Sequence, residues 1–367
     1  MSAPTVARTE RSDPPRLVAV VPAHNEEATI RAALTSLDRQ TVRPDRVVVV
    51  ADNCTDRTTA RARQSGVEVM RSVRNDCKKA GALNQALRGI LPVLDEEDVV
   101  LVMDADSIIA ETWVEAALRT LERPGVGAVG GVFYGQRGAG LVGLVQRMEY
   151  VRYARQLARR ADSRAFVLTG TASAFHVGTL REVAEARRTG RISGGGRDRK
   201  PVYYHERNIT EDSEMTLAIK TLGHECLSPM DCWVSTEVMP TWRALWRQRI
   251  RWQRGALENL RTFGLTRVTL PYAARQAWSF VELLLFTLYV VLTAVTAANG
   301  TLRVTAFWLA VGAVFVVERM ISVRRGGPLA VLVALGAVVD LAYGLFKHAV
   351  NLRCLYDIGR GRPAAWS

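Results

Sequence analysis

Cysteine and lysine are scarce in this 367-residue chain, and each scarcity excludes a class of protein. The five cysteines form no Cys-x-x-Cys pair, which argues against a disulfide framework or a zinc site. Only five of the 49 basic residues are lysine, and residues 1–240 hold 33 basic against 31 acidic side chains. A diffuse basic face that binds nucleic acid is therefore a poor fit, although the net charge is +13.

A hydrophobic leader is also missing from the first residues. Residues 1–16 are polar, include Pro14 and Pro15, and lack the apolar core of a signal peptide. We therefore expect a flexible N-terminal segment over 1–16, followed by a domain that stays in the cytoplasm with its thiols reduced.

From Leu17 onward, short valine-rich runs alternate with longer amphipathic stretches, a pattern typical of a mainly parallel sheet with crossover helices. The predicted strands are 17–22, 46–52, 67–71, 98–106 and 125–135. The predicted helices are 26–40, 57–65, 79–90 and 111–122. The sequence thus predicts an α/β domain over 17–240, in which the stretch 187–207, rich in glycine and arginine, forms a mobile loop or surface insertion.

The composition changes at Ala277, beyond which long apolar runs appear. The run 277–298 has 22 residues with Glu282 as its one charge, which is long enough to cross a bilayer of about 30 Å. Two weaker candidates follow at 304–317 and 329–346, and a buried core helix is the alternative for the shorter one. We expect about three transmembrane helices, with the basic loop between the second and third on the cytoplasmic side.

Two aspartates, Asp104 and Asp106, end the predicted strand 98–106. Ligands of open α/β sheets bind outside the carboxyl ends of the strands, and residues i and i+2 of a strand point the same way. Two neighbouring carboxylates repel, so a hard cation such as Mg²⁺ or Mn²⁺ would neutralise them while it coordinates phosphate oxygens. The alternative is a pair of solvated turn acids.

Other polar residues lie at the same predicted edge. No Gly-x-Gly-x-x-Gly turn follows the first strand, so a diphosphate would be held by a metal and by side chains. Asp52 ends the second strand, where its carboxylate can accept a hydrogen bond from a base or ribose. Lys79 stands at a predicted helix start and suits an anionic or ribose contact, although it can equally be a solvated first-turn lysine.

The segment TED places Glu211 and Asp212 before a helical run. Asp212 can act as a general base that removes the proton of an acceptor hydroxyl. The alternative is an N-cap at Thr210 followed by acidic first-turn residues.

The segment QRIRW places Gln248, Arg251 and Trp252 on one helical face, at i, i+3 and i+4. An arginine there can neutralise a departing diphosphate, and a tryptophan ring offers a flat platform for a sugar. The surrounding residues 241–276 hold eight arginines and one acidic residue, which suits anionic lipid headgroups. Anchoring of an amphipathic helix at the membrane is therefore the alternative to a role of these residues in binding the diphosphate and the sugar.

In this order, VVPAHNEE, ADNCTDRT, KAGALN, DAD, TED and QRIRW resemble the membrane-bound family 2 glycosyltransferases, which include cellulose, chitin, hyaluronan and poly-N-acetylglucosamine synthases. The resemblance covers about residues 17–265. It implies a GT-A (Rossmann-like) fold, a nucleotide-diphosphate sugar donor, a bound Mg²⁺ or Mn²⁺ ion, and inversion at the anomeric carbon.

The motifs also imply roles for single residues. The donor site would comprise Pro22, Glu26, Asp52, Lys79, Asp104 and Arg251, with Asp52 at the nucleobase and Asp104 at the nucleotide sugar. Asp106 would bind the metal together with Asp104, and Asp212 with Glu211 would form the catalytic pair. Gln248, Trp252 and Gly170 would line the acceptor, although TGTASAFH (169–176) keeps Gly170 alone as a clear match to the family's acceptor motif.

The resulting expectation is a multi-pass protein of the cytoplasmic membrane whose catalytic domain faces the cytoplasm. The expected parts are a flexible N-terminus (1–16), a GT-A domain (17–240), a basic interface region (241–276), a membrane domain (277–350) and a C-terminal tail (351–367). A UDP-hexose or UDP-N-acetylhexosamine would donate a sugar to a growing glycan. Single transfer to a lipid carrier or protein, and a nucleotide-sugar-binding scaffold without catalysis, are the alternatives. Three spans are too few to enclose a polysaccharide channel, so export would need a second copy or a partner protein.

Overall fold

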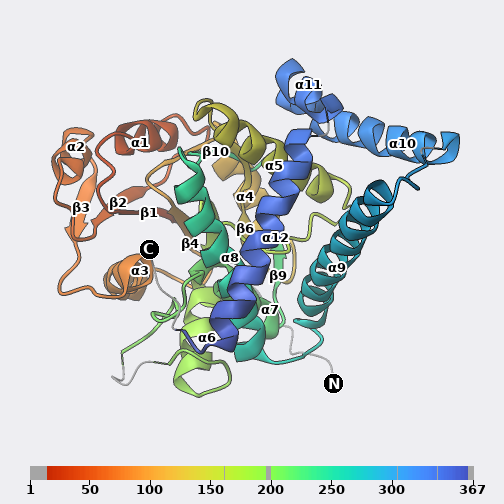
Figure 1. Cartoon of the computed structure of the whole chain (residues 1–367). Coiled ribbons are helices and arrows are strands. Elements are labelled where there is room, and N and C mark those ends of the chain that lie inside the picture. The colour runs from red at the N-terminus through yellow and green to blue at the C-terminus, as the bar shows by residue number, and fades with distance from the viewer. Residues whose placement is uncertain (1–14, 161, 196–199, 304, 337, 363–367) are drawn as a thin grey trace.

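The computed structural model describes residues 15–160, 162–195, 200–303, 305–336 and 338–362 (Figure 1). Most of the predicted flexible segment 1–16 therefore lies outside the described residues. Within them, the predicted α/β fold is confirmed, because a central sheet is covered by helices on both faces.

The central sheet has seven strands in the order β3-β2-β1-β4-β8-β6-β9. The strands are β1 (Leu17–Ala23), β2 (Arg46–Ala51), β3 (Glu68–Arg71), β4 (Val99–Met103), β6 (Val126–Gly130), β8 (Ala172–His176) and β9 (Glu225–Leu227). β1 runs parallel to β2 and β4, whereas β8 is antiparallel to β4 and β6. The carboxyl ends of β1, β2 and β4 therefore meet at one edge, as the sequence predicts.

Alternate residues of the valine-rich strands face two separate layers of helices. Val18 and Val20 pack in one core cluster, with α3 (Lys78–Ile90), α6 (Val177–Arg188) and α7 (Glu211–Thr221). Leu17, Ala19 and Val21 pack in the other, with α1 (Ile30–Asp38) and α4 (Trp113–Leu121). Two short elements, α2 (Thr58–Gln64) and the 3₁₀ turn η1 (Leu91–Val93), complete this part. A strand covered on both faces reads as a continuous apolar run, which explains the valine-rich signal.

Two predicted strands are wrong in their extent, because the chain changes sheet within each of them. The run 98–106 ends as β4 at Met103, and Asp104 to Asp106 form a turn before β5 (Ser107–Ile109). The run 125–135 is divided between β6 and β7 (Val132–Gly135). β5, β10 (Trp233–Thr236) and β7 form a second sheet of three strands. The two aspartates therefore share a turn and not a straight strand.

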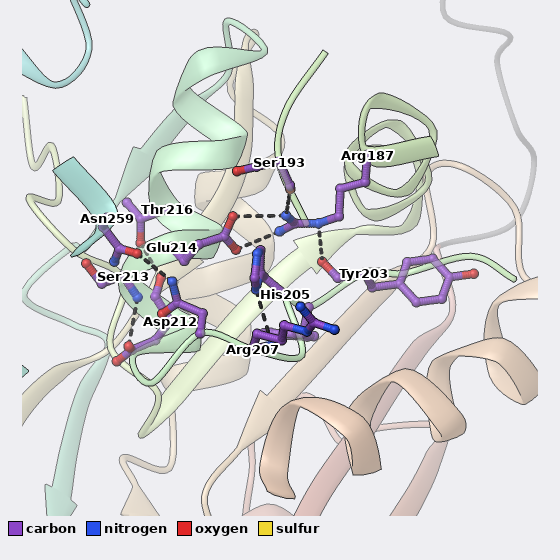
Figure 2. Close-up of polar contacts among 12 residues, drawn as sticks. Arg187, Ser193, Tyr203, His205, Arg207, Asp212, Ser213, Glu214, Thr216 and Asn259 are labelled. Carbon is purple, nitrogen blue, oxygen red and sulfur yellow. Dashed lines mark hydrogen bonds and ion pairs between the residues drawn. The ribbon is translucent and has the colours of Figure 1, made fainter. Parts of the chain in front are cut away.

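The stretch 187–207, predicted as a mobile loop or surface insertion, has many exposed residues in its described parts, but buried polar contacts hold both ends. Arg187 donates to both carboxylate oxygens of Glu214, at 2.9 and 2.6 Å, and both side chains are 0% exposed. Its guanidinium also reaches the backbone oxygens of Ser193 and Tyr203 (Figure 2). Asn84 accepts hydrogen bonds from the backbone of Tyr203 at 2.9 Å. The described parts of this stretch are consequently held by contacts with α3, α6 and α7.

Six longer or later helices follow or flank the sheets, and they are α5 (Gly140–Ala158), α8 (Trp242–Phe263), α9 (Leu270–Ala298), α10 (Ala306–Val323), α11 (Pro328–Gly336) and α12 (Val338–Gly359). A 3₁₀ turn, η2 (Arg324–Gly326), connects α10 to α11. α12 runs alongside α8 in front of the central sheet, whereas α9 stands apart from these two helices (Figure 1).

The C-terminal part differs from the prediction in two places. The run 329–346 is divided between α11 and α12, and the predicted tail 351–367 begins as the last turns of α12. Among the helices that the structure describes, α9 alone is long and apolar enough to cross a membrane, judged by length and composition. The expectation of about three membrane helices stays a prediction.

Candidate active site

Lys79, at the start of α3, lies at the centre of a group of acidic residues. Its Nζ atom is 2.5 Å from Asp104 Oδ1 and 3.3 Å from Glu211 Oε1. It also donates to the backbone oxygen of Gly170 at 3.3 Å. Lys78 before it has a φ of +50°, in the left-handed region, so the backbone turns sharply into the helix here. One lysine thus joins the ends of three elements, the β4 turn, the β8 loop and α7.

Asp212 lies beside this lysine on the first turn of α7. Its Oδ2 atom accepts a hydrogen bond from the Gly170 amide at 3.1 Å, and its Oδ1 atom accepts one from the Ser213 amide at 2.7 Å. A Cβ atom at Gly170 would lie 2.9 Å from Lys79 Nζ and 3.5 Å from carboxylate oxygens of both Asp104 and Asp212. The absence of a side chain at residue 170 therefore leaves room between the lysine and the two carboxylates.

Burial perturbs the titration of both carboxylates. It raises the pKa of Asp212 to about 6, and the charge of Glu211 beside it acts in the same direction. It also raises the pKa of Asp104 to about 6, although the Lys79 ammonium partly offsets the effect. Glu211 itself is buried, and its Oε2 atom accepts no hydrogen bond from the residues that the structure describes. Carboxylates with such pKa values are suited to exchange protons near neutral pH.

The Asp104–Asp106 turn carries more negative charge than its neighbours neutralise. Asp106 Oδ1 accepts a hydrogen bond from Ser107 Oγ at 3.0 Å. Burial raises the pKa of Asp106, and the charges of Glu26 and Glu237 raise it further. No set of three or more His, Cys, Asp or Glu side chains in the described part of the chain is arranged to hold a metal alone. The hard oxygens fit Mg²⁺ or Mn²⁺ if a ligand's phosphate oxygens supply further coordination.

Asp52 lies at the end of β2 and is already engaged by protein donors. Its Oδ1 atom accepts hydrogen bonds from Ser72 Oγ at 2.6 Å and from Asn75 Nδ2 at 2.8 Å. Pro22 is buried in β1, and Glu26 Oε2 accepts a hydrogen bond from Thr29 at 2.8 Å. The hydrogen bonds from Ser72 and Asn75 fix the orientation of the Asp52 carboxylate at the sheet edge.

The helix α8 carries the QRIRW segment. Burial lowers the pKa of Lys78, and the charge of Arg251 acts in the same direction. Asn259 donates to Thr210 Oγ1 at 3.3 Å, and a Cβ atom at Gly255 would lie 2.3 Å from that same oxygen. α8 therefore packs directly on the TED segment.

Comparison with known proteins identifies the family of the chain. Residues 14–255 match the family model described as "Glycosyltransferase like family 2". The chain belongs to glycosyltransferase family 2. It is 27% identical over 261 residues to the probable glycosyltransferase YdaM of Bacillus subtilis (strain 168), a match that covers 68% of this chain and 57% of that protein. The chain thus spans a little over half the length of this relative.

The chain is also similar to solved structures of other glycosyltransferases. The mannosyltransferase PcManGT from Pyrobaculum calidifontis, solved with GDP-Man and Mn²⁺, superposes with a TM-score of 0.62 at 21% identity, over 94% of this chain and 88% of that chain. Glucosyl-3-phosphoglycerate synthase from Mycobacterium tuberculosis, solved with Mn²⁺, UDP and phosphoglyceric acid, matches with a TM-score of 0.42 at 19% identity, over 67% and 78% of the two chains. The likeness to PcManGT supports the predicted GT-A-like fold.

In this family 2 chain, eight of the twelve predicted site residues fall into two groups. Lys79, Asp104, Gly170, Glu211 and Asp212 form the first, in direct contact, and Gln248, Arg251 and Trp252 form the second, on α8. The sequence did not reveal the residues that hold the side chains of the site in place. The missed residues are Ser72, Asn75, Glu149, Glu237 and Arg249. The sequence marks such a residue only as a polar side chain within an amphipathic stretch. This pattern does not identify the contact partner, which is distant in the chain.

Proposed function

We propose that this family 2 glycosyltransferase moves a sugar from a nucleotide-diphosphate sugar to an acceptor hydroxyl, with inversion at the anomeric carbon. The observation that carries the proposal is the direct contact network of Lys79, Asp104, Gly170 and Asp212 at the carboxyl edge of the sheet. It places a carboxylate with a raised pKa beside a fixed cation and an acidic turn.

The donor would bind across the edge formed by β1, β2 and β4. Asp52 would contact the base or ribose, and Lys79 and Arg251 would contact the diphosphate as cations. A Mg²⁺ or Mn²⁺ ion held by Asp104 and Asp106 would stabilise the charge that develops on the leaving diphosphate. The GDP-Man and Mn²⁺ bound by PcManGT support this choice of ligands.

Asp212 would act as the general base. The acceptor oxygen attacks the anomeric carbon as its proton passes to Asp212, and the bond between that carbon and the diphosphate oxygen breaks. The two amides that bind Asp212, from Gly170 and Ser213, hold its carboxylate in one orientation. Lys79 and Arg251 favour the departing charge because they are fixed before the reaction begins.

The membrane would hold the acceptor side of the enzyme. The most apolar 18-residue stretch of α9 has a mean hydropathy of 2.1, and it is not buried against the rest of the molecule. The preceding residues 241–276 carry eight arginines, which suit anionic headgroups at about 1 kcal/mol per basic residue. We therefore propose a catalytic domain held at the cytoplasmic face of the membrane, with a growing glycan or a lipid-linked sugar as acceptor.

A donor screen tests the proposal. Full-length protein in detergent is incubated with Mn²⁺ or Mg²⁺ and each of several UDP- and GDP-sugars, and release of nucleoside diphosphate is measured. We expect release of nucleoside diphosphate with one donor class. The family resemblance favours UDP-sugars, and GDP-mannose is included in the screen because PcManGT was solved with GDP-Man. Labelled product of many lengths would indicate polymerisation, and a single length would indicate single transfer. No release with any donor would favour the scaffold without catalysis.

The proposed metal site has its own test. Asp106→Ala should weaken nucleoside diphosphate binding in Mn²⁺ by roughly tenfold or more, since a charge-assisted contact is typically worth 1.5–3 kcal/mol. Calorimetric titration with and without Mn²⁺ measures this effect. A variant whose binding still depends on Mn²⁺ as strongly as the wild-type protein would count against Asp106 as a metal ligand.

A further inference from the structure

Arg249 is a buried cation in the middle of QRIRW, and its role is separate from that of the motif residues on either side. Its side chain is 7% exposed, and its Nη2 atom lies 2.6 Å from Glu149 Oε2 on α5. The Tyr343 hydroxyl on α12 donates to the same Glu149 oxygen at 2.7 Å and lies 3.4 Å from Arg249 Nε and Nη2. We call Glu149, Arg249 and Tyr343 the Arg249 network. It joins three helices that are far apart in the sequence.

The same guanidinium contacts both acceptor candidates of α8. Arg249 Nη1 donates to Gln248 Oε1 at 3.1 Å. The guanidinium carbon lies 4.3 Å from the centre of the Trp252 ring, which is a cation–π contact. Trp252 is 37% exposed, so one face of the ring is covered by Arg249 while part of the side chain stays open. The rotamers of Gln248 and Trp252 are therefore set by Arg249.

Arg249 is buried, whereas the Glu149 side chain is 31% exposed, and the charged form of Glu149 is favoured. Burial acts to raise the pKa of Glu149, but the positive charges of Arg249 and Lys347 outweigh it, and the net shift is downward. Tyr150, beside Glu149 on α5, lies 5.9 Å from the guanidinium carbon. The network thus links α5 and α12 to the α8 residues Gln248 and Trp252.

Stability alone does not account for such a pair. Replacing a buried ion pair by apolar residues of similar volume is often neutral or stabilising, because the pair repays little more than its desolvation. What the charged pair supplies, and an apolar pair cannot, is a directed contact to the Gln248 oxygen and the Trp252 ring. We infer that Arg249 is a positioning residue, which Glu149 and Tyr343 hold so that Gln248 and Trp252 are preorganised to bind the acceptor.

This inference rests on the proposed function, and it adds a part of the chain to the acceptor site. The family match ends at residue 255, whereas Tyr343 belongs to α12. The last helix, which follows the apolar helix α9 along the chain, would therefore complete the acceptor site. Binding of the donor, at the other end of the catalytic edge, would not depend on it.

The double variant Glu149→Met/Arg249→Met tests the inference in the full-length protein. Both charges are removed together, so neither is left buried and unpaired. We expect the KM for the acceptor to rise about tenfold, which corresponds to the loss of one or two modest contacts. The kcat at saturating acceptor and the Kd for nucleoside diphosphate should change by less than about twofold. The acceptor probes are tetrasaccharides of N-acetylglucosamine and of glucose.

Two further variants control the measurement. Arg254→Met/Glu258→Met removes an ion pair of 2.7 Å one turn farther along α8 and should leave the acceptor KM unchanged. Tyr343→Phe removes a single hydroxyl and should raise the acceptor KM a few-fold; it keeps the test available if the double variant does not fold.

Each outcome bears on one claim. A folded double variant, or Tyr343→Phe, with the acceptor KM of the wild-type protein would overturn the positioning role. If the wild-type enzyme releases nucleoside diphosphate but binds neither tetrasaccharide in titrations with the nucleotide present, the acceptor role of Gln248 and Trp252 fails, and this inference fails with it. A wild-type protein that turns over no donor contradicts the proposed function instead.

Discussion

The proposed donor and acceptor ends of the candidate site are built in different ways. At the proposed donor end, Lys79 contacts Asp104 directly, and Asp212 is joined to this pair through Gly170. These residues come from the turn after β4, the loop before β8 and the starts of α3 and α7. At the acceptor end, Gln248 and Trp252 stand on one helix and are held through Arg249 by α5 and α12. The donor end is thus part of the sheet edge, whereas the acceptor end depends on helix packing.

Each end also has a buried arginine–glutamate pair, and the two pairs differ. Arg187 and Glu214 are fully buried and tie the loop after α6 to α7, two residues beyond Asp212 (Figure 2). Arg249 is buried and Glu149 is 31% exposed, and Arg249 contacts Gln248 and Trp252, the proposed acceptor residues. The first pair is placed to hold backbone, and the second to hold side chains. Substitutions that separate chemistry, folding and titration can test this comparison.

The largest effect is expected at the base. Asp212→Asn keeps the shape of the side chain but cannot accept the acceptor proton, and general-base catalysis is typically worth about 10² to 10⁴ in rate. Transfer should fall by that factor, while nucleoside diphosphate binding stays close to the wild-type value. Initial rates with labelled donor and calorimetric titration measure the two quantities.

The matched control is Asp231→Asn, the same chemical change at an exposed aspartate that pairs with Arg119. It should leave both quantities unchanged. Transfer by Asp212→Asn at more than about a tenth of the wild-type rate would remove Asp212 from the role of base.

The next effect concerns stability at the Arg187–Glu214 pair. Arg187→Met leaves the Glu214 carboxylate buried without its partner, which typically costs about 3–5 kcal/mol of unfolding free energy. Arg187→Met/Glu214→Met should recover most of this loss. Urea unfolding of the two variants and the wild-type protein measures the difference. A single variant as stable as the wild type would show that this pair does not hold the loop.

The sequence predicted the donor end well because its signals are local. A strand that is buried on both faces produces a valine run, and polar residues after such a run must lie at the sheet edge. Asp52 and Asp104 could be placed in this way. The turn at Asp106 could not, because β5 pairs with β10, more than a hundred residues away in the chain.

The acceptor end could be predicted only in part. The helical spacing of QRIRW placed Gln248, Arg251 and Trp252 on one face, but it gave Arg249 no role, because its partners Glu149 and Tyr343 are distant in the sequence. The buried contacts of the stretch 187–207 could not be predicted for the same reason. Its glycines and arginines are typical of a surface loop, and nothing local indicates that Arg187 is paired with Glu214.

The smallest effect is expected in the pH dependence. Asp212 must be deprotonated to accept a proton, and its pKa is raised to about 6 by burial and by Glu211, with Lys79 acting in the opposite direction. The value of kcat/KM should therefore fall about tenfold per pH unit below that pKa and level off above it. Glu211→Gln removes a negative charge beside Asp212, so the inflection should move to lower pH. Glu225→Gln, at a half-buried glutamate on β9 that is paired with Arg164, is the control and should not move the inflection. An inflection that stays in place in Glu211→Gln would mean that burial alone sets the pKa of the base.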